Sequence, residues 1–162
     1  MSGRKLVIGY GNPLRGDDRL GWEIAGSLAA GVADESVAIM AVHQLTPELA
    51  EPVSQADMVI FVDASYEGTP GTWKCDEVEP APATTDPLGH HFSISGLLAY
   101  AQAVFSAQPK AFVISVAAES FDCREALSPI VELALPQIVR YIRDKVGCPN
   151  PTLNPNHEVT HA

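Results

Sequence analysis

The chain has few basic residues and no long apolar run, and each shortage excludes a class of partner. Its 162 residues contain 10 Lys and Arg against 20 Asp and Glu, which gives a formal net charge of -10. So acidic a chain lacks the positive surface with which proteins bind nucleic acids or anionic membranes. The uncharged stretch at residues 95–109 is too short to span a bilayer and contains Ser and Gln. We therefore expect neither a nucleic acid nor a membrane as a partner.

Cysteine is also scarce, and this bears on the compartment and on metal sites. The three cysteines, Cys75, Cys123 and Cys148, lack the C-x-x-C spacing of zinc sites and redox motifs. An odd number without such spacing favours a reducing compartment over a disulfide framework. Residues 1–5 lead directly into an apolar segment, so no secretory signal peptide is visible. We expect a cytoplasmic protein.

Apolar segments alternate with segments of helical periodicity along the chain. Strand-like runs lie at residues 5–9, 36–42, 58–62 and 111–116, and a less regular run at 72–79 suits an edge strand. Continuously apolar strands are typical of a parallel sheet that helices cover on both faces. The order of elements predicts an α/β protein, an open and mostly parallel sandwich.

The helices are predicted from apolar spacing and from capping residues. Residues 20–32 carry apolar side chains four apart, and Thr46 and Ser128 each precede a proline, as at the start of a helix. Ser93 or Ser95 is the candidate N-cap of a further helix. Pro136 lies inside the last helical pattern and should kink or restart it.

We expect one domain over residues 1–147 and a flexible tail over residues 148–162. The tail is rich in Pro and Asn and has no apolar periodicity. Its histidines, His157 and His161, are expected to be solvated.

Ligands of such sheets bind beyond the carboxyl ends of the strands, and the loop at residues 9–18 follows the first strand. The dinucleotide fingerprint G-x-G-x-x-G fails there because Leu14 stands at the third glycine. A phosphate loop fails because Asp17 and Asp18, not Lys and Ser or Thr, follow Gly16. Two carboxylates at the start of a helix would repel a phosphate. The loop therefore favours a cation, which weakens the hypothesis of a mononucleotide-binding protein.

Other polar residues are expected at the same edge of the sheet. Asp63 ends the third strand, and the pair His90 and His91 precedes a helix. Each has a structural explanation: the acids of the loop as helix caps, Asp63 as a turn residue, and a histidine as a donor to a carbonyl. Together, two carboxylates and an imidazole form a ligand set for a borderline metal ion.

Conventional nucleophiles are poorly supported. No serine lies in a G-x-S-x-G turn. Cys123 with His43 or His90 as its base is conceivable, but no neighbouring residue marks Cys123 as reactive. Tyr10 and Trp22 are interpreted as packing residues around the first loop.

The sequence resembles the nickel-iron hydrogenase maturation endopeptidases. The resemblance rests on Gly9-Tyr10-Gly11-Asn12-Pro13-Leu14-Arg15-Gly16-Asp17-Asp18, on Val62-Asp63-Ala64, on the His90 segment before Leu97-Leu98-Ala99, and on Leu127-Ser128-Pro129. The segment His43-Gln44-Leu45-Thr46-Pro47-Glu48 is similar to that of the subgroup that processes NAD-linked bidirectional hydrogenases. The match covers residues 4–145 and implies a three-layer α/β/α sandwich around a twisted sheet of about five strands.

The resemblance also implies a function and a site. The family, of aspartyl-type endopeptidases, removes a C-terminal extension from the hydrogenase large-subunit precursor after nickel has been inserted. Its catalytic and metal-binding residues correspond here to Asp18, Asp63 and His90, with His91 as the second choice for the histidine. The nickel is expected to come from the substrate, and the protein to be a monomer.

One position departs from the family pattern. The family follows its acid pair with glycine, whereas Arg19 stands there in this chain. We expect this cation to pair with Asp17 or Asp18, or to contact the end of the substrate. The alternative function is a nickel-binding or metal-sensing module without hydrolytic activity, which would use the same three residues.

Overall fold

The structure, a computed structural model, describes residues 3–82 and 92–147, with a five-stranded sheet at its centre. The strands are Lys5–Tyr10 (β1), Val37–Val42 (β2), Met58–Ser65 (β3), Trp73–Val78 (β4) and Lys110–Ala117 (β5). Their order in the sheet is β2-β1-β3-β5-β4. All neighbours are parallel except β4, which runs antiparallel to β5 at the edge. The predicted mostly parallel sheet and its edge strand are confirmed.

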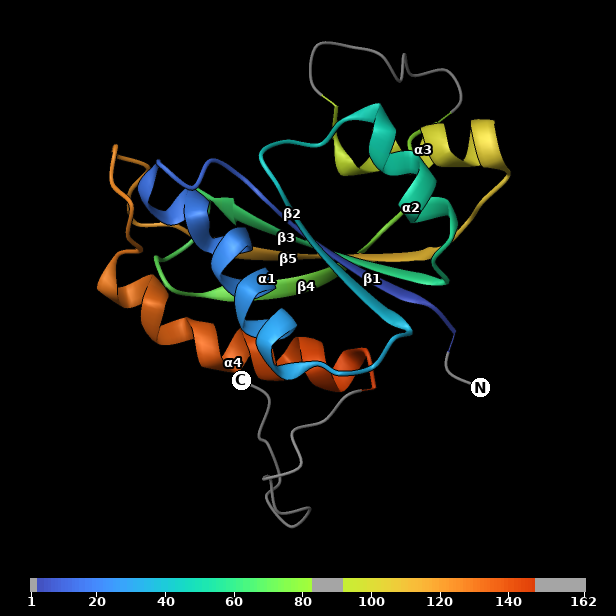
Figure 1. The fold of residues 1–162 in the computed structure, drawn as a ribbon. Helices are drawn as coiled ribbons and strands as arrows, with labels where there is room; N and C mark the ends of the chain where they lie inside the picture. Colours follow the sequence, from blue (N-terminus) through green and yellow to red (C-terminus); the bar gives the residue numbers. More distant parts are fainter. Residues whose placement is uncertain (1–2, 83–91, 148–162) are drawn as a thin grey trace.

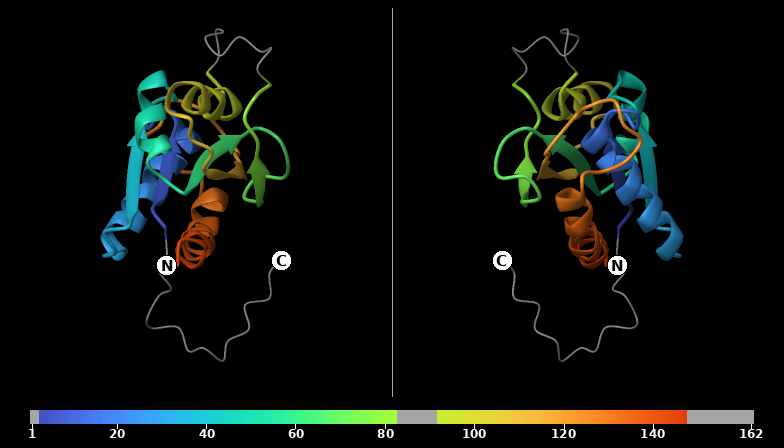
Figure 2. Two further views of the ribbon diagram at one scale, coloured as in Figure 1. Left: turned by 90° about the vertical axis from the view of Figure 1, so that its right-hand side faces the viewer. Right: turned by 90° about the vertical axis from the view of Figure 1, so that its left-hand side faces the viewer.

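Helices cover both faces of this sheet (Figures 1 and 2). They are α1 (Leu20–Gly31), α2 (Ala50–Ser54), α3 (Ile94–Phe105) and α4 (Pro129–Lys145), with short 3-10 helices η1 (Gly16–Arg19) and η2 (Pro47–Leu49) before α1 and α2. The side chains of α1 and α4 belong to one buried cluster, and those of α2 and α3 to another. The three-layer α/β/α sandwich is therefore confirmed.

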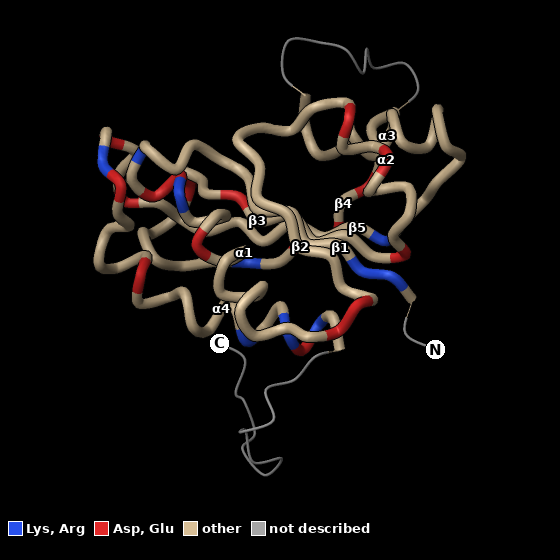
Figure 3. The backbone as a smooth tube through the Cα atoms, in the orientation of Figure 1, with Lys and Arg blue, Asp and Glu red and all other residues tan. Residues whose placement is uncertain are grey.

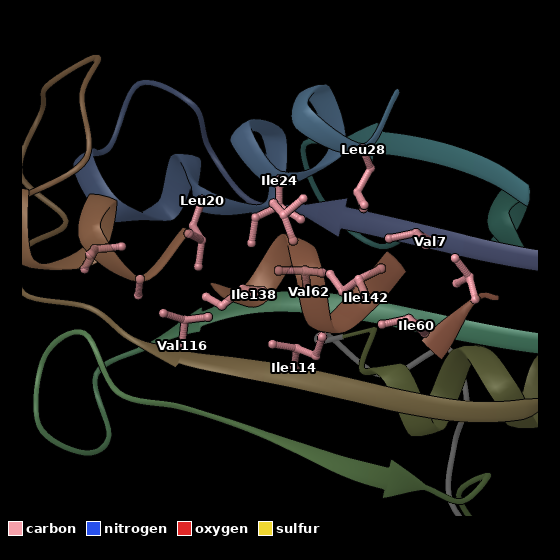
Figure 4. Close-up of a cluster of buried hydrophobic side chains, with 14 residues drawn as sticks. Val7, Leu20, Ile24, Leu28, Ile60, Val62, Ile114, Val116, Ile138 and Ile142 are labelled. Carbon is pink, nitrogen blue, oxygen red and sulfur yellow. The ribbon is translucent and has the colours of Figure 1, made fainter. Parts of the chain in front are cut away.

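Alternation along the strands sends neighbouring residues into the two buried clusters. Val62 and Ile114 pack with Ile24 and Ile138 of α1 and α4, as Figure 4 shows. Phe61, one position earlier in β3, packs instead in the cluster of α2 and α3. Burying such a side chain contributes about 1.5–3 kcal/mol. The two clusters together make the sheet a rigid base for the loops at its carboxyl edge.

Two glycines bring the first helix unusually close to the first strand. A Cβ atom on Gly9 of β1 would overlap the backbone of Gly21 in α1, and one on Gly21 would overlap the backbone around Gly9. Only glycine permits this approach of the two backbones. The approach places η1 directly beyond the end of β1.

The capping predictions are confirmed in part. The Ser93 hydroxyl accepts a hydrogen bond from the Gly96 amide at 3.0 Å, which selects Ser93 rather than Ser95 as the N-cap. Thr46 and Ser128 stand at N-cap positions, but neither side chain makes a capping hydrogen bond to the backbone of its helix. The predicted restart at Pro136 is wrong, because α4 is one helix that contains this proline. No helix in the described ranges is both long enough and apolar enough to cross a membrane.

Candidate active site

A cavity of about 320 Å³ lies at the carboxyl ends of β1, β2 and β3, where ligands of open α/β sheets bind. It brings together the two acids that the sequence analysis placed in one site, Asp18 and Asp63. The other residues that line it are Tyr10, Gly11, His43, Gln44, Leu45 and Phe92. Figure 3 shows acidic positions on several loops at this end of the sheet.

Asp18 is held in place by the loop that precedes it. One carboxylate oxygen, Oδ2, accepts a hydrogen bond from the Asn12 amide at 2.7 Å. Gly11 has a φ of 144° and lies so close that a Cβ atom there would overlap Asp18. Trp22 packs on this loop as predicted, because its Nε1 donates to the Gly11 carbonyl at 2.9 Å. The carboxylate of Asp18 is therefore fixed in position while it still lines the cavity.

Asp63 is the more perturbed of the two acids. Burial, reinforced by the negative charge of Asp18, raises its pKa to about 6. Hydrogen bonds from the Tyr10 hydroxyl and the Ala64 amide act in the opposite direction and limit the rise. Tyr10 has a strongly raised pKa because it is buried and faces the carboxylate of Asp63, so its hydroxyl stays protonated and acts as a donor. The interpretation of Tyr10 as a packing residue alone is therefore incomplete.

Asp17 does not face the cavity residues but is completely buried beneath the loop that precedes α4. Its carboxylate accepts hydrogen bonds from the Ser128 amide at 2.7 Å and from the Ser128 hydroxyl at 2.7 and 2.8 Å. The amides of Glu119 and Ser120 donate to it at 2.8 and 3.0 Å. Burial raises the pKa of Asp17, but these donors outweigh burial and lower it overall. Asp17 thus joins η1 to a segment more than 100 residues away.

The expected pairing of Arg19 with an acid of the loop is wrong, whereas its contact with the end of the substrate stays a prediction. Its Nε donates to the Glu23 carboxylate at 2.6 Å, and its second guanidinium nitrogen donates to the Pro13 carbonyl at 3.1 Å. Arg19 and Glu23 are one helical turn apart, the spacing at which side chains on a helix meet. Arg19 therefore ties the first loop to α1, and within residues 3–82 and 92–147 no salt bridge compensates the charges of Asp18 and Asp63.

Of the three predicted site residues, the structure describes Asp18 and Asp63 but not His90. His90 and His91 lie outside the described residues, and Phe92, which follows them, lines the cavity. Over residues 3–82 and 92–147, no group of three or more His, Cys, Asp and Glu is arranged to hold a metal ion. His43 lines the cavity from the end of β2, whereas the exposed Cys123 does not line it. Asp18 and Asp63 supply two oxygen donors that suit a divalent cation, and a third ligand must come from elsewhere.

The sequence contains a signal for the role of Tyr10 beside Asp63, but no local signal for the partners of Asp17. In register, Gly9 lies beside Val62, so the next residues, Tyr10 and Asp63, project to the same face of the sheet. The alternation of side chains along β1 and β3 therefore predicts that Tyr10 and Asp63 are neighbours. The partners of Asp17 follow β5, and no spacing in the sequence reveals that contact.

Solved structures with the same architecture place this geometry in context. The chain is similar to the hydrogenase maturating endopeptidase HybD from Escherichia coli, with 26% sequence identity and a TM-score of 0.74 over 89% of this chain and 94% of that one. A solution structure of an endopeptidase from Escherichia coli is 28% identical, with a TM-score of 0.68 over 88% and 93% of the two chains. The nickel-iron hydrogenase maturation protease HycI from Thermococcus kodakarensis shares the fold at 20% identity, with a TM-score of 0.73 over 88% and 92%.

Sequence comparison alone is less informative. No protein-family model and no curated protein matches the chain. The structural similarity nevertheless extends over about nine tenths of the chain and of each protein named above. The resemblance first noted in the loop at residues 9–18 is therefore confirmed at the level of the whole fold, which is that of the nickel-iron hydrogenase maturation proteases.

Proposed function

We propose that this chain is an endopeptidase that removes the C-terminal extension of a nickel-iron hydrogenase large-subunit precursor once nickel is in place. Several of its structural neighbours are hydrogenase maturation peptidases, which supports a peptidase that acts in hydrogenase maturation. The observation that carries the finer proposal is the meeting of Asp18 and Asp63 in one cavity at the carboxyl edge of the sheet. A cytoplasmic monomer that acts on this precursor is part of the same proposal.

The chemistry of the pair favours a cation carried by the substrate. Two carboxylates that share a cavity repel each other, and this repulsion contributes to the raised pKa of Asp63. A divalent cation between them would relieve the repulsion and favour the ionised form of Asp63. In our proposal Asp18, Asp63 and His90 complete the coordination of nickel that the precursor brings, and the nickel polarises the scissile carbonyl. Cleavage would then depend on prior insertion of the metal.

Tyr10 and Asn12 keep the two acids in position for this role. The Tyr10 hydroxyl donates to Asp63, and the Asn12 amide donates to Asp18. Each bond occupies one position on its carboxylate, and the remaining lone pairs are available to a cation. The site therefore presents two oriented oxygen ligands before the substrate arrives, which reduces the cost of ordering them on binding.

The test is to incubate purified variants with nickel-loaded precursor and to follow the shortening of the large subunit on a gel. Asp18→Ala, Asp63→Ala and His90→Ala should each abolish processing while the circular dichroism spectrum stays native. His91→Ala is the matched control and should process normally. Normal processing by Asp18→Ala or Asp63→Ala would refute the proposed site, and loss in His91→Ala alone would exchange the two histidines. A folded wild-type protein that binds the precursor but never shortens it would support the non-hydrolytic alternative.

A further inference from the structure

A second cavity, of about 340 Å³, lies beside the candidate active site, over the carboxyl ends of β3 and β5 and against β4. It is distinct from the cavity that contains Asp18 and Asp63, because the two share no lining residue. The residues that matter for its chemistry are Ser65, Thr72, Lys74, Asp76, Ser115 and Ala117.

The pairing of the strands places the second cavity directly next to Asp63. Asp63 of β3 lies beside Ser115 of β5, which in turn lies beside Lys74 of β4. Neighbouring strands are about 4.8 Å apart, so the backbone of Lys74 lies about 10 Å from that of Asp63. An extended peptide rises about 3.3 Å per residue and covers this distance with about three residues.

Both cavities open on the same face of the sheet. Phe61 of β3 packs against α3, and residues two apart on a strand share a face, so Asp63 and Ser65 project to that side as well. Val113 of β5 contacts the same cluster, which places Ser115 and Ala117 on that side too. In Figure 1, α2 and α3 lie over the opposite half of the sheet, away from the ends at which β3 and β5 finish.

Apart from Trp73, Glu67 and the Lys74–Asp76 pair, the cavity is lined by small residues, several of them with hydroxyl groups, which suit the main chain of a peptide better than an apolar ligand. Ser65 accepts a hydrogen bond from the Glu67 amide, and the Thr72 hydroxyl donates to the Thr69 carbonyl. Among the described residues that line the cavity, the one cation is Lys74, which is 3.5 Å from the Asp76 carboxylate. Glu67 adds a second carboxylate to the lining, so Lys74 offsets only part of its negative charge. Within the described residues, the Ser115 hydroxyl has no hydrogen-bond partner and can bond to an incoming main-chain group.

We propose that this second cavity is the subsite that binds the first residues of the C-terminal extension, on the far side of the scissile bond from the precursor's folded body. The proposal rests on the proposed function, since it requires the bond to be cut at Asp18 and Asp63. The extension is the occupant because it ends in a free terminus and can lie along a shallow cavity. The segment before the cut is tied to the folded body that carries the nickel.

The experiment combines an enzyme variant with a shortened substrate. Ser115→Leu fills the cavity beside Asp63, and Val113→Leu is the matched control because it enlarges the same face of the same strand outside the cavity. Each enzyme is assayed for kcat and KM on nickel-loaded precursor with its full extension and with the extension cut back to one residue. Lys74→Ala, at an exposed position, with Lys110→Ala as its control, covers the case in which Ser115→Leu does not fold.

The expected result is a loss that depends on the extension. Ser115→Leu should raise KM at least tenfold on the full precursor, with kcat within twofold of wild type, and Lys74→Ala should raise it about threefold. The wild-type enzyme should have a higher KM on the shortened precursor than on the full precursor. Neither variant should raise the KM on the shortened precursor further. An equal fall in kcat on the full and the shortened precursor would mean that Ser115→Leu acts through Asp63. An equal rise in KM on the two precursors would mean that the cavity binds the precursor's folded body. Either result overturns the proposal. A wild type that cuts neither substrate would instead overturn the proposed function on which this subsite rests.

Discussion

The two neighbouring acids of the first loop should differ sharply when each is changed to alanine. Asp17→Ala removes the only acceptor that the structure provides, within the described residues, for the Ser128 hydroxyl, and it leaves the amides of Glu119 and Ser120 without their partner. Hydrogen bonds to a charged group contribute about 1.5–3 kcal/mol each, but losses within one network do not add. We expect Asp17→Ala to lower the free energy of unfolding by about 3–5 kcal/mol, as for breaking a buried charge network.

Asp18→Ala should cost much less stability because Asp18 accepts one backbone hydrogen bond in a partly buried setting. The expected loss is about 1 kcal/mol. For a chain of this size, 1 kcal/mol corresponds to about 2–4 °C in Tm, so Asp17→Ala should melt about 10 °C below wild type and Asp18→Ala about 3 °C below. Activity should show the opposite order: Asp18→Ala is inactive, whereas Asp17→Ala retains processing at temperatures where it is folded.

The assay is urea unfolding followed by circular dichroism, with processing of nickel-loaded precursor measured on the same samples. Because the folded pKa of Asp17 lies below its ordinary value of 3.8, the stabilisation is complete above that value and is lost as pH falls through the lower folded pKa. The stability difference between wild type and Asp17→Ala should therefore narrow below about pH 4. An Asp17→Ala protein within 1 kcal/mol of wild type at pH 7 would refute this account of the buried carboxylate.

Three further changes test other parts of the account. Asp63→Asn should abolish processing yet raise the free energy of unfolding by about 1–3 kcal/mol at pH 7, because the folded pKa of Asp63, about 6, lies above its ordinary value of 3.8 and its ionisation therefore costs stability. Urea unfolding should show this gain disappear below about pH 4, and an unchanged stability at pH 7 would contradict the prediction. A variant in which Cys75, Cys123 and Cys148 are all changed to Ser should still cut the precursor. Loss of cutting in this variant, if it is folded, would restore the hypothesis of a Cys123 nucleophile. A chain that ends at Gly147 should keep its Tm and its activity, and a truncated protein that melts normally but no longer cuts would give residues 148–162 a role in function.

The architecture could be predicted because it depends on local patterns. Continuous apolar runs marked the central strands, and Thr46, Ser93 and Ser128 marked the starts of helical segments. The role of Ser128 was not predictable, because its hydroxyl bonds to Asp17 across the fold instead of capping α4. A capping signal in sequence indicates where a helix begins and does not indicate which group the side chain binds.

The site could be predicted to the extent that it follows from topology. Asp18 and Asp63 each follow a parallel strand, and the carboxyl ends of such strands meet at one edge. The separate roles of Asp17 and Asp18 depend on burial, which two adjacent identical residues cannot reveal in sequence. The pairing of Arg19 with Glu23 follows from helical spacing, whereas nearness in sequence favours the acids of the loop as its partners.

The central claim is that the carboxylate site acts on a metal carried by the precursor. Two carboxylates at an open cavity should bind free divalent ions weakly, since tight structural sites close with four ligands rich in Cys and His. The measurement is to strip the enzyme and the nickel-loaded precursor separately with a chelator, to remove the chelator, and to mix each with its untreated partner. The account predicts that the stripped enzyme cuts untreated precursor at the normal rate and that the stripped precursor is not cut by untreated enzyme. Loss of activity on stripping the enzyme, with recovery on addition of zinc, would contradict it.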